Sequence, residues 1–321
     1  MSKAKVELGR HLFYDRRMSI NGKQSCASCH RQELAFTDGR ARAEGATGQT
    51  HPRSSMSLVN VAYAPALTWA NPVLDSLEEQ ALVPMLGDNP VELGLNGREQ
   101  AFLDVVKRDP VYQRLFPAAF PDENRFTLQN ITRAVAAFER SIVSMRSPYD
   151  RYRWAGELRA ISDAAKRGEI LFFSSERAAC FRCHGGWNFS AVRFEGSRPA
   201  VDGDGLFFNT GVSEYEPPNR GIYEHTGRTE DIGKFRAPTL RNIALTAPYM
   251  HDGSLRTLEE VIDHYAVGGK MDHANKSKIL RKLQLTESDK EDLIEFLRSL
   301  TDEDLLRDPR WSDPWQDPKR R

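Results

Sequence analysis

The sequence predicts a mostly α-helical protein made of two similar domains. Two distant segments share one plan, "LGRHLFYDRRMSINGKQSCASCH" at 8–30 and "RGEILFFSSERAACFRCH" at 167–184. Each contains a glycine, an amphipathic helix end, a polar loop and a Cys-x-x-Cys-His motif, as an internal duplication would. Strand signals are sparse, and a long loop rich in Gly and Pro at 185–235 suits a cofactor pocket better than a sheet. We therefore expect one domain at 1–150 and a second at 151–321.

Helical periodicity supports this division. A helix near 128–142 precedes the expected boundary at 146–156, and a last helix begins after a capping threonine, Thr286. The apolar faces of these two helices consist of Leu128, Ile131, Val135, Phe138 and Ile142, and of Leu293, Phe296, Leu297 and Leu300.

The segment "TLEEVIDHYAVGG" at 257–269 predicts a short capped helix. Thr257 can cap it, Glu260 is at the reciprocal capping position, and Gly268 can end it. Its apolar face consists of Leu258, Val261, Ile262 and Tyr265. By this spacing His264 points outward, and Tyr265 on its own would be interpreted as a core aromatic residue.

All four cysteines belong to the two Cys-x-x-Cys-His motifs, "CASCH" and "CFRCH". This spacing is the attachment signature of c-type haem: the two sulfurs bond the vinyl groups and the adjacent histidine binds the iron. A thioredoxin-like redox pair would not need the trailing histidine twice, and a zinc site would need four ligands in one neighbourhood. A structural disulfide is the remaining alternative. The sequence thus predicts two cytochrome c-like domains, each with one covalently bound haem, attached through Cys26, Cys29 and His30 and through Cys180, Cys183 and His184.

Composition narrows the class of protein. Lys plus Arg equals Asp plus Glu at 45 each, so no overall charge indicates binding to nucleic acid or membranes. No apolar run reaches the length of a membrane span. Because c-type haem is attached outside the cytoplasm, we expect a periplasmic protein. Residues 1–25 show no apolar signal region, so we expect that a signal peptide has been removed.

Seven motifs together resemble the bacterial dihaem cytochrome c peroxidases, and more closely their MauG-type branch, which oxidises partner proteins. They are "SCASCH", "FTDGR", "RSSMSLVNVAY", "NPVELG", "CFRCH", "KFRAPTLRNIALTAPYMHDGSL" and "TLEEVIDHY". The resemblance extends from "ELGRHLFYD" to the final helix.

The resemblance implies that the first haem reacts with hydrogen peroxide and has His30 as its proximal ligand. Glu92 matches the family's acid–base glutamate, which moves a proton between the peroxide oxygens, and Gln80 matches a neighbouring glutamine. Ala46 stands where ordinary peroxidases have a distal histidine, so the iron is expected to stay open. His51, five residues later, is the residue that could still ligate this iron.

The resemblance also implies groups between the haems. Trp69 matches a tryptophan between the haems, although a core role is its alternative. Asn60, Thr246 and Pro248 match the family's calcium ligands, a side-chain oxygen and two backbone oxygens, which suit a hard cation.

For the second haem, the resemblance implies His184 as proximal ligand and a further ligand nineteen residues after Thr246. Peroxidases have methionine there, MauG-type proteins have tyrosine, and this chain has Tyr265. Phenolate is a hard anion that favours Fe(III) and makes Fe(IV) accessible, whereas a thioether favours Fe(II).

The function implied is peroxide-dependent oxidation of a side chain, Trp above all, on a periplasmic partner protein, with both irons reaching Fe(IV). Two such modifications are known in the family, maturation of a tryptophan-derived quinone and conversion of Trp to kynurenine. "LTWANP" and "GDNPVELG" look closer to the second. The alternatives are a peroxide-removing cytochrome c peroxidase and a dihaem electron carrier without peroxide chemistry. Trp187, Trp311 and Trp315 are candidates for contact or relay, with a solvated tail or core packing as their simpler explanations.

Overall fold

Helices supply nearly all the regular structure, as the sequence predicts. The structure is a computed structural model and describes residues 1–121, 124–190 and 205–316. The helices in these ranges are α1 (Lys3–Tyr14), α2 (Cys26–Cys29), α3 (Leu77–Leu86), α4 (Glu99–Arg108), α5 (Pro110–Ala119), α6 (Leu128–Glu139), α7 (Pro148–Trp154), α8 (Asp163–Phe173), α9 (Tyr223–Thr226), α10 (Leu258–Ala266) and α11 (Glu287–Arg298). Two short strands, β1 (Phe207–Asn209) and β2 (Lys234–Arg236), pair antiparallel.

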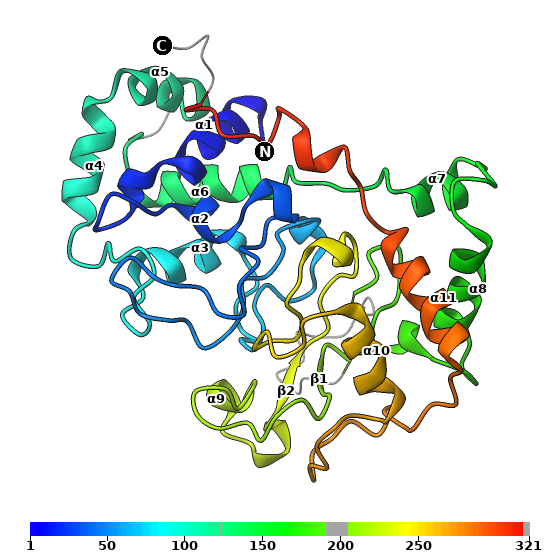
Figure 1. Ribbon diagram of the computed structural model, residues 1–321. Coiled ribbons are helices and arrows are strands. Elements are labelled where there is room, and N and C mark those ends of the chain that lie inside the picture. The colour runs from blue at the N-terminus through cyan, green and yellow to red at the C-terminus, as the bar shows by residue number, and fades with distance from the viewer. Residues whose placement is uncertain (122–123, 191–204, 317–321) are drawn as a thin grey trace.

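The two halves share one helix crossing. Helix α1 packs on α6 in the first half, and α8 packs on α11 in the second (Figure 1). A glycine lies at each crossing, because a Cβ atom at Gly9 would collide with the carbonyl of Ala134, and one at Gly168 with that of Asp292. Only glycine allows the backbones to approach this closely. The repeated segments of the sequence therefore occupy corresponding places in the fold.

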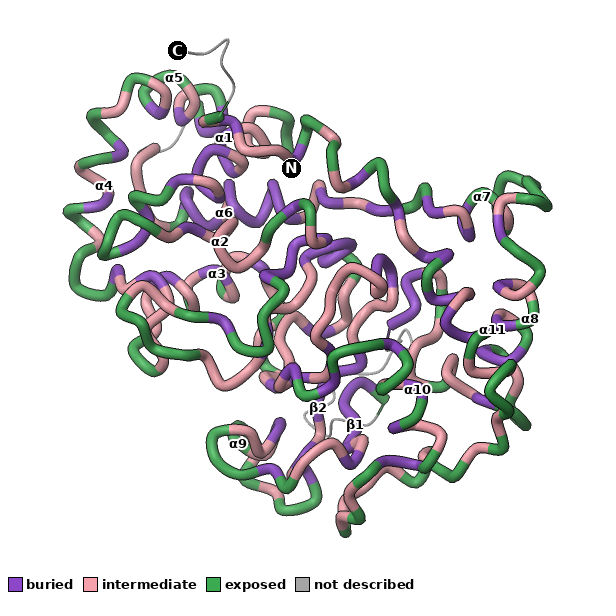
Figure 2. Tube along the Cα trace, viewed as in Figure 1, coloured by how far each residue is buried: buried purple, intermediate pink, exposed green. Residues whose placement is uncertain are grey.

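The predicted apolar faces of α6 and α11 are buried. Ile131, Val135 and Phe138 belong to the first hydrophobic core, and Leu293 and Phe296 to the second. Figure 2 shows this burial along both helices. The predicted capping threonine is in place, since Thr286 forms a capping box with Asp289. Thr127 also caps α6 and accepts a hydrogen bond from the N–H of Asn130.

Two local expectations need correction. The stretch 185–235 is not entirely loop, because β1 lies in it and pairs with β2 through Phe207 and Arg236; residues 191–204 of this stretch lie outside the described residues. In α10, Thr257 accepts from the N–H of Glu260 as expected, but the Glu260 carboxylate accepts from the N–H of Arg256 and not from that of Thr257. Only the reciprocal bond of the capping box is therefore displaced, by one residue toward the N-terminus.

The C-terminal tail returns to the first half of the molecule (Figure 1). Trp311 is buried in the first core, and the Trp315 indole donates to the carbonyl of His11 at 3.0 Å. The Tyr14 hydroxyl donates to the carbonyl of Trp311 at 2.6 Å. These tryptophans therefore serve in core packing. The division into domains at 1–150 and 151–321 stays a prediction. The C-terminal tail, although it belongs to the second range, packs on the first.

Within the described ranges, no helix has both the length and the apolar character needed to span a bilayer.

Candidate functional site

Each Cys-x-x-Cys-His motif opens into its own cavity. The first cavity is lined by Cys26, Cys29 and His30, and the second by Cys180, Cys183 and His184. The first motif forms the short helix α2, and the second forms a 3-10 turn at Cys180–Arg182. In both, the short turn brings two sulfurs and one imidazole to the wall of a single cavity, as c-type haem attachment requires.

The two histidines are oriented in the same way. His30 Nδ1 lies 2.9 Å from the carbonyl oxygen of Phe36, and His184 Nδ1 lies 3.0 Å from that of Pro238. Because a carbonyl only accepts, Nδ1 carries the hydrogen and Nε2 is left as the metal-binding atom. Burial lowers the pKa of both imidazoles, that of His184 to about 4, so both are neutral, as an iron ligand must be.

The cysteines fit thioether attachment better than the alternatives. All four are unbridged, which argues against a structural disulfide. Burial raises the pKa of Cys183 to about 11 and that of Cys180 to about 12, so neither is an activated redox thiolate.

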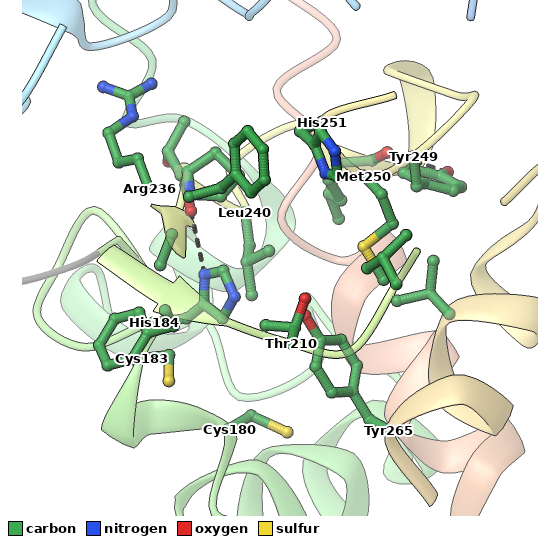
Figure 3. A pocket seen from close by; sticks show the side chains of 18 of the residues that line it. Cys180, Cys183, His184, Thr210, Arg236, Leu240, Tyr249, Met250, His251 and Tyr265 are labelled. Atoms are coloured by element: carbon green, nitrogen blue, oxygen red, sulfur yellow. Dashed lines mark hydrogen bonds between the residues drawn. The ribbon is translucent and has the colours of Figure 1, made fainter. Parts of the chain in front are cut away.

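Tyr265 and His184 enter the second cavity from opposite sides (Figure 3). Leu258, Val261 and Ile262 line the same cavity, so the predicted face of α10 is confirmed. The expectation for His264 is wrong: its side chain is only 1% exposed, and Nε2 lies 2.8 Å from the carbonyl oxygen of Thr210. A second buried face of α10 therefore packs on the segment after β1, which helical periodicity alone did not indicate.

The Tyr265 phenol depends on its surroundings for its charge. Burial raises its pKa, and the neighbouring Cys183 and Cys180 raise it further, while a hydrogen bond with the Thr210 side chain acts in the opposite direction. A phenolate in this cavity therefore needs a cation beside it, and a bound ferric ion would supply one.

The far end of the second cavity fits the propionates of a haem. Figure 3 shows Arg236 and His251 at the end opposite Cys180 and Cys183. Arg236 Nε and His251 Nε2 are buried and have no hydrogen-bond partner among the described atoms. Arg236 is 7% exposed, and no carboxylate of the described chain pairs with it. A haem attached through its vinyl edge presents two carboxylates at the opposite edge, which would satisfy these donors.

The first cavity holds the predicted acid–base glutamate and its neighbouring glutamine. Glu92 and Gln80 both line it, together with Pro84. Gln80 and Pro84 belong to α3, in which Pro84 lacks the N–H that would bond the carbonyl of Gln80. Burial raises the pKa of Glu92 to about 7, close to the value that suits a group which both accepts and returns a proton.

His51 also lines this cavity, and its neighbour is Glu92. Its Nε2 atom lies 3.9 Å from Glu92 Oε1. Its Nδ1 accepts a hydrogen bond from the N–H of Arg53 at 3.0 Å. Sequence reasoning considered His51 only as an iron ligand and missed this pairing, because the pairing arises from a loop contact between distant residues.

Trp69 lies beside the segment 54–57, which is near both cavities. The indole N–H of Trp69 donates to the carbonyl of Ser54 at 2.9 Å, and Trp69 itself lines the second cavity. Residues 54–57 line the second cavity as well, while the backbone of Met56 hydrogen-bonds with His30 of the first. Trp69 is thus placed near the wall between the cavities.

The three expected calcium ligands are in different environments. Asn60 is fully buried, and its Oδ1 accepts from the N–H of Ser144 at 2.9 Å, which leaves one lone pair of that oxygen. Thr246 and Pro248 line the second cavity. Calcium binding by these residues stays a prediction.

Trp187 lies against an exposed aromatic ring. Its ring centroid is 5.0 Å from that of Tyr63, edge to face, and Tyr63 is 56% exposed. The buried Arg241 guanidinium covers the Trp187 ring at 5.3 Å.

Comparison with known proteins agrees with this geometry. Residues 3–158 match the family described as "Di-haem cytochrome c peroxidase". The chain is 34% identical to the methylamine utilization protein MauG of Methylorubrum extorquens over 297 residues, covering 92% of this chain and 78% of that protein. It is 36% identical to cytochrome-c peroxidase IdrP1 of Denitromonas iodatirespirans over 330 residues, covering 96% and 84%.

Among solved structures, a MauG-like protein associated with microbial copper homeostasis superposes with a TM-score of 0.92 at 42% identity, covering 98% of this chain and 94% of that one. Dihaem enzymes of this kind are oxidoreductases with peroxidase-type activity, so a carrier without peroxide chemistry is not supported. The paired haem cavities and these relatives together show that the chain belongs to the dihaem cytochrome c peroxidase and MauG family of oxidoreductases.

Proposed function

We propose that this protein uses hydrogen peroxide to oxidise a tryptophan side chain on a partner protein in the periplasm. The observation that carries the proposal is Tyr265, which faces His184 across the second cavity (Figure 3). The similarity to MauG and to the MauG-like protein associated with copper homeostasis supports it. We include in the proposal a high-valent state shared by both irons, covalent attachment of both haems, and calcium at Asn60, Thr246 and Pro248.

The ligand at position 265 decides which oxidation state the second haem favours. The two haems supply the redox chemistry when bound. A thioether ligand would favour ferrous iron, which suits a haem that collects electrons from a small donor. The hard phenolate oxygen of Tyr265 favours higher oxidation states, which suits withdrawal of electrons from a poor donor such as a tryptophan side chain.

The residues of the first cavity transfer protons to and from the bound peroxide. Reduction of one peroxide to two waters consumes two electrons and two protons, so the partner side chain loses two electrons per peroxide. Glu92 takes the proton from one peroxide oxygen and returns it to the leaving oxygen. Gln80, in the same wall, orients the peroxide through its amide.

Electrons from the partner must cross the protein one at a time. Trp69 would connect the two cavities, because it lies beside the 54–57 segment that is near both. The Trp187–Tyr63 pair offers a partly exposed aromatic contact three residues after His184 in the chain. Aromatic rings in contact provide such a path without large conformational change.

A Tyr265→Met variant tests the proposal. The holoprotein is mixed with peroxide and with a candidate partner encoded next to this chain, and the partner is then analysed by mass spectrometry. We expect an oxidised tryptophan with the native protein and with the control variant Tyr249→Phe, which changes another tyrosine of the same cavity. We expect none with Tyr265→Met. Full partner oxidation by Tyr265→Met would refute the proposal.

A second candidate function is removal of hydrogen peroxide with electrons from a small donor protein. It is favoured by the 36% identity to cytochrome-c peroxidase IdrP1. Rapid steady turnover with a reduced small cytochrome or azurin would support this function over partner oxidation.

A further inference from the structure

One buried carboxyl group in the first cavity has no part in the scheme above. Glu139 is the last residue of α6, is 5% exposed, and lines the cavity that holds Gln80 and Glu92. Its Oε2 atom is buried and has no hydrogen-bond partner among the described residues. A buried carboxyl oxygen without a hydrogen-bond partner costs folding free energy that an apolar leucine would not cost, so a function for this group is worth seeking.

The next residue does not neutralise Glu139. Both terminal nitrogens of Arg140 donate to the carboxylate of Glu78 in α3, at 2.7 and 2.6 Å. Burial raises the pKa of Glu139 to about 8, with Arg140 lowering the pKa and Glu78 raising it by smaller amounts. Glu139 is therefore a neutral acid at pH 7, although a cation lies next to it in the sequence.

Two other titratable groups that line this cavity, Glu92 and His51, face each other, with His51 Nε2 3.9 Å from Glu92 Oε1, whereas Glu139 lies at the end of α6. Helix α1 packs Phe13 against Phe138, and its Tyr14 hydroxyl is engaged with the carbonyl of Trp311. From α2, Cys26 is close enough for the charge of Glu139 to raise its pKa. A Cys26 sulfur bonded to haem no longer titrates, and Glu92 lies in the same cavity with its own proton role.

We propose that Glu139 is a redox-linked proton site of the first haem. It keeps its proton when the iron is reduced and releases it when the iron loses an electron. The electron passes to the external acceptor, the O–H bond of the carboxyl group breaks, and the proton leaves to solvent. The net charge of the cavity then stays constant, because the new positive charge on the iron is balanced by the carboxylate. In an interior of low dielectric constant, such compensation stabilises the oxidised state more than it would in water.

This inference is independent of the partner protein, since it concerns the first haem alone. Its test measures reduction potentials in the absence of peroxide. The proposal for Glu139 can therefore fail while partner oxidation is observed, and partner oxidation can fail while the proposal for Glu139 holds.

The experiment is potentiometric titration of the holoprotein between pH 5.5 and pH 10, with the first haem followed by its spectrum. To isolate Glu139, Glu92→Gln serves as the background. We expect a pH window in which the oxidation equilibrium changes up to tenfold per pH unit, about 59 mV for one electron. Adding Glu139→Gln should abolish this window. Adding the control change Glu44→Gln, a largely exposed carboxyl group that lines the same cavity, should retain it. An unchanged window in Glu139→Gln would overturn the proposal.

Infrared difference spectroscopy of the Glu92→Gln holoprotein gives a second test, which does not require the Glu139→Gln variant to fold. Oxidation of the first haem at pH 7 should remove the C=O band of a protonated carboxyl group and add carboxylate bands. A protonated-carboxyl band that does not change on oxidation would also overturn the proposal. The spectrum of the second haem in Glu139→Gln reports whether that variant keeps the native fold.

Discussion

The Nε2 atom of His51 lies 3.9 Å from the Oε1 atom of Glu92 in the wall of the first haem cavity. Burial lowers the pKa of His51 and raises that of Glu92 to about 7. Both shifts favour neutral forms, so the pair is poised to exchange a proton with a bound peroxide rather than to form a fixed ion pair. The sequence motif identifies Glu92, and the fold supplies its neighbour.

Replacing Glu92 with glutamine should slow the reaction with peroxide by about 10²–10⁴-fold, because general acid–base catalysis contributes that much. Stopped-flow absorbance of the holoprotein after mixing with peroxide measures the rate. Glu44→Gln is the matched control, since Glu44 lines the same cavity but its side chain is largely exposed and near Arg40. An equal loss in both variants would contradict the role of Glu92.

The same rate should depend on pH through Glu92. The carboxylate is the form that accepts the peroxide proton, so the rate should fall as pH decreases through about 7. Each pH unit below that value should reduce the rate about tenfold. A native rate that is constant between pH 5 and pH 8 would show that another group is the base, and Glu92→Gln should lose the dependence.

Replacing His51 with alanine should leave the spin state of the first haem unchanged. His51 Nδ1 is bonded to the backbone of Arg53, and Nε2 faces Glu92, so neither nitrogen is needed by the iron. Electron paramagnetic resonance of the oxidised holoprotein measures this. A change from a six-coordinate to an open signal in His51→Ala would show instead that His51 is an iron ligand.

Replacing Arg236 with methionine should lower the reduction potential of the second haem. Removal of a buried cation near the iron favours the oxidised state. The loss of hydrogen bonds to a haem carboxylate should also destabilise the holoprotein by about 1.5–3 kcal/mol. Denaturant titration and potentiometry measure the two effects. Arg281→Gln, an exposed cation at the rim of the same cavity, should change neither.

Replacing His264 with leucine should destabilise the protein by about 1–3 kcal/mol, because the partly buried carbonyl of Thr210 would lose its partner. The absorption spectrum of the second haem should shift slightly while Tyr265 remains bound, since the Thr210 side chain hydrogen-bonds with Tyr265. Asp263→Asn, on the exposed side of α10, is the control. Loss of a ligand of the second haem in His264→Leu would mean that His264, and not Tyr265, binds that iron.

Much of the fold could be predicted because its main signals are local. The Cys-x-x-Cys-His spacing, the apolar periodicity of α6 and α11, and the glycines at 9 and 168 each depend on residues close together in the chain. Local spacing also placed Tyr265 on the cavity face of α10. It failed for His264, because the neighbour that buries this side chain, Thr210, is 54 residues away.

The sequence by itself determined the two Cys-x-x-Cys-His motifs, and through its family resemblance it pointed to a glutamate for proton transfer and a tyrosine where peroxidases have methionine. Only the tertiary structure decided which buried polar and charged side chains have partners in the chain and which do not. The neighbours of Arg236, His251 and Glu139 come from distant segments, and the cost of an unpaired polar atom depends on burial, which is a property of the whole fold. For that reason the propionate end of the second cavity and the isolated carboxyl group of the first became visible only in three dimensions.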